Sequence, residues 1–165
     1  NPGGRLPVTF YQSAEQLPPF TDYSMRGRTY RFFKGEPLFP FGYGLSYTTF
    51  GYDRLSVSKQ ESPGGSVKVS IDVRNTGKLT GDEVVQVYVR NSRAADADPL
   101  RSLAGLRRVT LRPGERKTVD FQVHSGVAGE YEIYVGGKQP GFSGLLDAKS
   151  TGLVRGTIRL SGIRE

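Results

Sequence analysis

The 165-residue sequence predicts a mainly β protein, in which a seven-stranded sandwich is preceded by an extended segment. Two observations predict this architecture. From residue 51 onward, apolar and polar residues alternate in short runs, and turn-forming residues separate the runs. Before residue 51 the chain is rich in Pro, Gly and aromatic residues, without a sustained helical or alternating pattern. We therefore divide the chain into a segment of residues 1–50 and a β domain of residues 51–165.

Each run in the β domain carries β-branched or aromatic residues at every second position, which gives a strand one buried and one solvent-facing side. The runs cover residues 55–57, 67–73, 85–89, 109–111, 119–123, 131–135 and 154–160. Sequences such as Ser62-Pro63-Gly64-Gly65 and Arg112-Pro113-Gly114-Glu115 supply turns between them. Seven short strands over about 110 residues are typical of an immunoglobulin-like or fibronectin type III-like sandwich. An eight-stranded jelly roll is the alternative.

Residues 1–50 contain only short apolar pieces, at Leu6–Phe10, Tyr30–Phe33 and Leu38–Phe41, each flanked by Pro or Gly. Such pieces are too short to bury one another. We expect them to pack between the sandwich and a larger body outside this chain, and to lack fixed structure without that body. Aromatic rings also stack on sugars, but packing is the favoured role of the aromatic residues here: Phe20, Tyr23, Tyr30, Phe32, Phe33, Phe39, Phe41, Tyr43, Tyr47 and Phe50.

Composition excludes several classes of protein. The sequence has no Cys, so it has no disulfide, no thiolate nucleophile and no cysteine-ligated zinc site. Its net charge of +7 comes from scattered Arg and Lys residues, without the basic helix or aromatic strand motif of nucleic-acid-binding modules. No apolar run of about 18 residues is present to cross a membrane as a helix. We therefore expect no nucleic-acid partner, no membrane partner, and no metal or other cofactor.

The most suggestive pair of carboxyl groups is Glu130 and Glu132. Residues two apart on a strand share a face at roughly 6.5–7 Å, which overlaps the carboxyl spacing of inverting glycosidases. A glycosidase, however, needs its two carboxyl groups on opposite sides of a bond, whereas these two point the same way. A solvated strand face is the favoured interpretation. The pair Asp82-Glu83 is weaker still, because adjacent strand residues face opposite sides.

The remaining candidates are incomplete. His124, the single histidine, ends a strand, and as a base it would need a nucleophile and an orienting carboxylate that the sequence does not place. Gly42-x-Gly44 lacks the third glycine and the following helix of a dinucleotide loop. Gly137-Lys138 lacks the other residues of a phosphate loop. We therefore assign no catalytic and no metal-binding residue to this chain, and its substrate-binding residues are unknown.

The order of motifs in the whole chain resembles the C-terminal part of glycoside hydrolase family 3 enzymes. The stretch NPGGRLPVTF (1–10) resembles the end of the α/β sandwich domain of that family. The stretch LPPFTDYSMRGRTYRFFKGEPLFPFGYGLSYTTF (17–50) resembles the connection to its fibronectin type III-like domain. That domain is matched by EVVQVYVRN (83–91), LAGLRRVTLRPGERKTVDFQV (103–123) and GEYEIYVGG (129–137). The start at Asn1, with neither Met nor a signal peptide pattern, fits a piece of such a longer protein.

The resemblance implies a retaining exo-β-glycosidase, which removes terminal β-D-glucosyl or β-D-xylosyl residues from oligosaccharides. It implies an Asp nucleophile and a Glu acid/base that both lie upstream of this chain. Arg28, Tyr30 and Phe41 match the family pattern, and the match implies packing between domains. The chain alone is then expected to be inactive, with the upstream domains as its partner and with a periplasmic or secreted location. A homo-oligomer is compatible with the sequence. The alternative is a stand-alone, non-catalytic carbohydrate-binding or interaction module.

Overall fold

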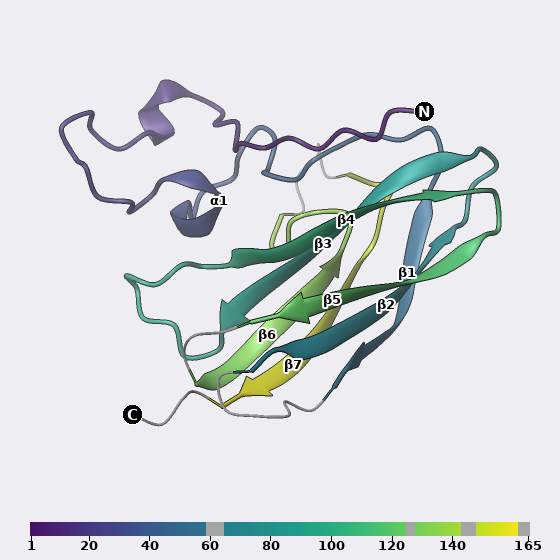
Figure 1. Ribbon diagram of the computed structural model, residues 1–165. Helices are drawn as coiled ribbons and strands as arrows, with labels where there is room; N and C mark the ends of the chain where they lie inside the picture. The colour runs from purple at the N-terminus through teal and green to yellow at the C-terminus, as the bar shows by residue number, and fades with distance from the viewer. Residues whose placement is uncertain (59–64, 125–127, 143–147, 162–165) are drawn as a thin grey trace.

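The computed structural model describes residues 1–58, 65–124, 128–142 and 148–161. Within them the chain forms two antiparallel sheets packed face to face (Figure 1). The first sheet has the order β1-β2-β5, from β1 (Phe50–Val57), β2 (Val67–Asn75) and β5 (Arg116–Val123). The second has the order β4-β3-β6-β7, from β3 (Gly81–Asn91), β4 (Ser102–Leu111), β6 (Gly129–Gly136) and β7 (Leu153–Leu160). The predicted seven-stranded, fibronectin type III-like sandwich is confirmed.

The hydrophobic core lies between the two sheets and uses the residues that alternation singled out. Ile71 on β2 and Ile133 on β6 are fully buried, as is Val87 at the centre of β3. Phe121 and Tyr131 are also buried, as their positions within the runs predict. Burial of branched apolar side chains at about 25 cal/mol per Å² supplies the main stabilising contribution to such a sandwich.

One strand is longer than the sequence pattern predicts. Only Val109 and Leu111 mark the fourth run, yet β4 begins at Ser102. The register between β3 and β4 shifts between Val87 and Tyr88, so the first half of β4 does not alternate in step with the second half. Gly105 lies in that first half, beneath the ring of Phe121, where a Cβ would come within 2.9 Å of the ring. Because of the glycine and the register shift, the first half of β4 lacks the apolar–polar alternation by which the other strands were predicted.

Residues 1–50 run along the outer side of the four-stranded sheet, and include a short 3-10 helix, η1 (Ala14–Gln16), and α1 (Thr29–Phe32) (Figure 1). The expectation that the segment also packs against a body outside this chain, and lacks fixed structure without it, stays a prediction. The backbone N–H of Leu100 donates to the carbonyl of Arg31 at 2.7 Å, which ties α1 to the β3–β4 connection. Within the chain, the segment packs on the outer face of β3, where it contacts Gln86 and Tyr88.

Candidate functional site: the junction between residues 1–50 and the sandwich

Strand β3 is buried on both faces, and its side chains organise the junction. Glu83 and Val85 face the sandwich interior, whereas Gln86 and Tyr88 face residues 1–50. All four side chains are at most 3% exposed. A strand that separates two packed layers in this way needs partners for every polar group it buries. Those partners come from residues that are distant in the sequence.

Glu83 receives its partners from three other parts of the chain. Arg5 Nη2 donates to Glu83 Oε2 at 2.6 Å, and the Tyr52 hydroxyl donates to Oε1 at 2.5 Å. The Thr151 hydroxyl also donates to Oε1. The Arg5 side chain is 8% exposed and that of Glu83 is fully buried, so this is a buried ion pair. At Gly137 a Cβ would collide with Glu83 Oε1, so the backbone there approaches the carboxylate as only glycine allows.

Burial raises the pKa of Glu83, and the bonds from Arg5, Thr151 and Tyr52 partly offset that rise. Burial and the neighbouring carboxylate raise the pKa of the Tyr52 hydroxyl well above its usual value. Both oxygens of Glu83 are occupied by donors from the protein itself. Because the side chain is also fully buried, the carboxylate is closed to an outside ligand, and its chemistry is that of an internal anchor.

A second cluster lies on the outer face of β3. The amide of Gln86 donates to the carbonyl oxygens of Gly42 and Gly137, both at 3.1 Å, and its Oε1 accepts from the Tyr88 hydroxyl at 2.5 Å. Gly42 has a φ of +77°, and a Cβ there would collide with the Gln86 amide. The first glycine of Gly42-x-Gly44 therefore serves a close backbone approach to β3.

Tyr30 and Phe41, two of the family-matched residues, cover Tyr88. Their rings stack on each other with centroids 4.2 Å apart, and Tyr30 meets Tyr88 edge to face at 6.2 Å. The Tyr30 hydroxyl accepts a hydrogen bond from the backbone N–H of Leu103 at 3.1 Å. Aromatic pairs of this kind add about 0.5–1.5 kcal/mol beyond the area that they bury. Tyr88 is consequently sealed against solvent and provides no sugar-binding surface.

The third cluster closes the end of the sandwich around Asn75, which is fully buried. Its amide nitrogen donates to the carbonyls of Leu79 and Leu111, at 2.8 and 2.9 Å. Its oxygen accepts from the Thr48 hydroxyl at 2.7 Å and from the Gly77 N–H at 3.0 Å. One side chain thus joins the end of residues 1–50 to the turns after β2 and β4.

The structure separates the other candidate carboxyl groups. Glu130 is exposed, whereas Glu132 accepts from the Tyr134 hydroxyl at 2.8 Å and pairs with Arg155. Asp82 lies on the opposite side of β3 from Glu83 and accepts from Arg108 Nε at 2.9 Å. Glu132 and Asp82 are therefore engaged in cross-strand pairs with arginine side chains.

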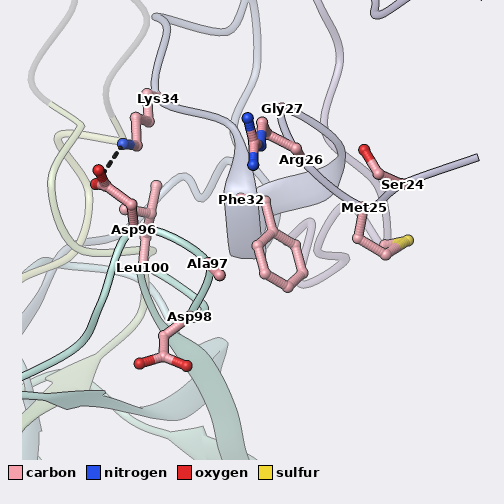
Figure 2. Close-up of a pocket in the computed structure, with 10 residues that line it drawn as sticks. All are labelled: Ser24, Met25, Arg26, Gly27, Phe32, Lys34, Asp96, Ala97, Asp98 and Leu100. Atoms are coloured by element: carbon pink, nitrogen blue, oxygen red, sulfur yellow. Dashed lines mark hydrogen bonds and ion pairs between the residues drawn. The ribbon is translucent and has the colours of Figure 1, made fainter. Parts of the chain in front are cut away.

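Two further candidates from the sequence follow different strands. His124 follows β5 and has an exposed side chain. The backbone of Gly137 borders the carboxylate of Glu83. A hollow of about 530 Å³ lies between residues 24–27 and residues 96–100. The ring of Phe32 is among the side chains that line it (Figure 2). Lys34 and Asp96 form an exposed ion pair at 3.3 Å on its wall. Among the described residues, no three His, Cys, Asp or Glu side chains lie together as a metal site would require. In the same part of the chain, no helix is long and apolar enough to cross a membrane.

Carboxyl groups with lowered pKa values make the stability of the fold dependent on pH, and Asp82 and Glu132 are two of them. The Thr110 hydroxyl, followed by Arg108, lowers the pKa of Asp82. The Tyr134 hydroxyl, followed by Arg155, lowers the pKa of Glu132. A carboxyl group with a lowered pKa in the folded state binds fewer protons than in the unfolded state. Its contribution is present above the unfolded pKa, about 3.9 for Asp and 4.3 for Glu, and is lost as the pH falls through the folded pKa.

We therefore expect the free energy of unfolding to fall as the pH is lowered from about 5 toward 3. Glu83, whose pKa is raised, acts in the opposite direction over part of this range. Urea unfolding at several pH values measures the slope. The Asp82→Asn/Glu132→Gln double variant should reduce it, while Asp22, Asp72, Glu115 and Asp120, whose pKa values are also lowered, keep part of it. An unchanged slope in that variant would show that these two groups do not set the acid sensitivity.

The fold and this junction define a class of protein: a fibronectin type III-like domain that carries the end of a preceding domain on its outer face. Comparison with known families agrees with that class. Residues 1–47 match the glycosyl hydrolase family 3 C-terminal domain, and residues 83–126 match the fibronectin type III-like domain. The chain corresponds to the C-terminal region of glycoside hydrolase family 3 proteins, as the sequence motifs indicate.

Individual relatives agree with this assignment. A xylan 1,4-beta-xylosidase of Xylanibacter ruminicola is 47% identical over 123 residues, which cover 74% of this chain and 14% of the relative. A periplasmic beta-glucosidase of Salmonella typhimurium is 40% identical over 136 residues, which cover 74% of this chain and 18% of the relative. The chain therefore spans less than a fifth of the length of these curated relatives.

Solved structures show the same arrangement of the chain. Beta-glucosidase 3B of Thermotoga neapolitana, in complex with α-D-glucose, superposes with a TM-score of 0.76 at 28% identity. The match covers 96% of this chain and 24% of that structure. It therefore includes most of residues 1–50 as well as the sandwich.

Proposed function

We propose that this chain is the C-terminal portion of a retaining exo-β-glycosidase that hydrolyses terminal, non-reducing β-D-glucosyl or β-D-xylosyl residues of oligosaccharides. The observation that carries the proposal is the pair of family matches in sequence order, joined by the buried Arg5–Glu83 pair. Within this proposal residues 1–50 complete the preceding α/β domain, and residues 51–165 form the fibronectin type III-like domain. The nucleophile and the acid/base belong to the part upstream, and this chain stabilises that part by packing on it.

The site chemistry supports a non-catalytic role. A retaining glycosidase holds its two carboxyl groups about 5–5.5 Å apart, on either side of the scissile bond. In the described residues, the carboxyl groups of Glu83, Glu132 and Asp82 are each bonded to an arginine. None of the three is free to act on a glycosidic oxygen. The alternative of a stand-alone carbohydrate-binding module loses support because Tyr88 is sealed beneath Tyr30.

A periplasmic or secreted location belongs to the same proposal. It is supported by the name of the Salmonella typhimurium relative, a periplasmic beta-glucosidase. Glucosides and xylosides remain joint candidates, because relatives with both kinds of name match the same region.

The test compares the protein encoded by the complete open reading frame with the 165-residue chain. We expect the longer protein to hydrolyse aryl β-D-glucosides or aryl β-D-xylosides with retention at the anomeric carbon, observed by NMR. The chain alone should show no hydrolysis above the buffer rate. A Glu130→Gln/Glu132→Gln variant of the chain is the control, since it removes the two carboxyl groups whose strand spacing overlaps that of inverting glycosidases. Hydrolysis by the chain alone that this variant abolishes would overturn the proposal.

A further inference from the structure

Two aromatic rings in residues 1–50 are almost fully exposed in the part of the chain that the structure describes. Phe20 is 92% exposed and Tyr23 is 90% exposed. Among the described residues, most large apolar side chains that are exposed lie in residues 1–50, and only Leu79 and Leu106 lie in the sandwich. Most of the exposed apolar surface therefore lies in one segment, and its two most exposed members are three residues apart.

A loop of residues 17–28, cross-linked by internal hydrogen bonds, presents these rings. The guanidinium of Arg28 donates from Nη2 to the carbonyls of Asp22 at 2.6 Å and Pro19 at 3.3 Å, and from Nε to the carbonyl of Ser24 at 3.1 Å. The Asp22 carboxylate accepts from the Ser24 N–H at 2.8 Å. The loop is thus folded around the side chain of Arg28, which holds its backbone in place by bonding its carbonyl groups.

The same bonds determine what kind of partner fits the loop. Sugar recognition combines ring stacking with polar side chains that bond the hydroxyl groups. Asp22, which lies between the two rings in sequence, and Arg28 both direct their charged groups into the loop. Exposed rings on a loop held in one conformation are instead what anchor residues of protein interfaces look like, because little conformational entropy is lost on docking.

We propose that Phe20 and Tyr23 are anchors that insert into the part of the enzyme that precedes this chain, and that Arg28 positions them. The inference rests on the proposed function, in which this chain is the C-terminal portion of a longer protein. The loop falls inside the match to the family 3 C-terminal domain, and more than four-fifths of the length of the curated relatives lies outside the matched region. A partner on the same chain also acts at high effective concentration, so two ring anchors suffice to hold it.

Hydroxyl-radical footprinting with mass spectrometry tests the proposal, because it measures the oxidation of each ring without using hydrolysis. The longer protein is compared with the 165-residue chain. In the longer protein the oxidation of Phe20 and Tyr23 should fall roughly tenfold, since rings now about nine-tenths exposed become buried anchors. Leu79 and Leu106 are internal controls, and their oxidation should be equal in the two proteins.

Variants of the longer protein test the role of Arg28. Arg28→Met leaves both rings in place but removes the loop's internal bonds, and we expect it to restore much of their oxidation. Arg28→Lys should restore less, because an ammonium group keeps some of the bonds to carbonyl oxygens. A Phe20→Ala/Tyr23→Ala variant should unfold at a lower temperature than the parent, whereas Leu79→Ala/Leu106→Ala should not.

Three outcomes would overturn the proposal. The rings could stay equally reactive in both proteins. They could become shielded in the 165-residue chain at high concentration, which would indicate a second copy as the partner. They could become shielded only when cellotriose or xylotriose is added, which would indicate a sugar platform. A longer protein that hydrolyses glycosides but leaves both rings reactive would overturn this inference while the proposed function stands. Shielded rings in a protein without glycosidase activity would do the reverse.

Discussion

Replacing Arg5 with Met is expected to lower the free energy of unfolding of the 165-residue chain by about 3–5 kcal/mol, because the change leaves the carboxylate of Glu83 buried without its counter-charge. Glu83 is fully buried, so water does not replace the lost guanidinium. Urea unfolding monitored by tyrosine fluorescence measures the loss. Replacing Glu83 with Leu should cost less, because Arg5 lies on residues 1–50 and its head group can turn toward solvent.

A double-mutant cycle separates the ion pair from the packing of the two side chains. The Arg5→Met/Glu83→Leu variant should be more stable than the sum of the single losses predicts, by about 1 kcal/mol or more. The matched control is Arg155→Met, which breaks a pair whose arginine is 63% exposed and should cost less than about 1 kcal/mol. If Arg5→Met costs no more than Arg155→Met, the buried pair does not hold residues 1–50 on the sandwich.

Replacing Asn75 with Ala is expected to cost about 3 kcal/mol, the second largest loss among the predicted substitutions. Four hydrogen bonds disappear at once, and the carbonyl of Leu111 together with the hydroxyl of Thr48 loses a partner in a buried environment. Leaving a buried polar group unsatisfied costs about 1–3 kcal/mol. Thermal unfolding followed by circular dichroism measures the effect.

The control for Asn75 is its neighbour in sequence. Thr76 carries an exposed hydroxyl that bonds only the hydroxyl of Thr49 among the described contacts, at 2.8 Å. Thr76→Ala should therefore change the stability by less than about 0.5 kcal/mol. Equal losses for the two substitutions would show that the turn backbone, and not the buried amide, fixes the end of the sandwich.

The sequence predicted the strands well because most of them have one buried and one wet face. In β2, the buried residues Val69, Ile71 and Val73 alternate with residues that carry polar side chains, so a period of two is visible without a structure. The same pattern identified the core. It also indicated that Asp82 and Glu83 face opposite sides of one strand, which the structure bears out.

Alternation failed where a strand is buried on both faces. The run from Val84 to Val89 contains Val84 and Tyr88 at the positions where a wet strand face would carry polar residues. A nearly continuous apolar run is typical of a strand covered on both sides. The signal for a second packed layer over β3 was therefore present in the sequence, whereas the expectation that residues 1–50 also need a body outside this chain stays a prediction.

The Glu83 cluster could not be predicted from sequence patterns. Arg5 and Glu83 are 78 positions apart, and Thr151 is a further 68 positions beyond Glu83. No local period relates such residues, and a carboxylate in a strand is usually solvated. Only the register of the sheets and the path of residues 1–6 bring these groups together. Gly137 is needed because its backbone lies against the carboxylate of Glu83, and no sequence pattern marks this contact.

The double burial of β3 has a consequence for how this region can be exchanged between proteins during evolution. A fibronectin type III-like domain is usually regarded as a module that can be recombined at its boundaries. Here a recombination point just before Phe50 would strip the cover from Gln86 and Tyr88 and leave Glu83 without Arg5. The segment that can be recombined as a whole is therefore longer than the sandwich and begins upstream of Arg5. A functional recombinant would keep β3 together with the layers that pack on both of its faces.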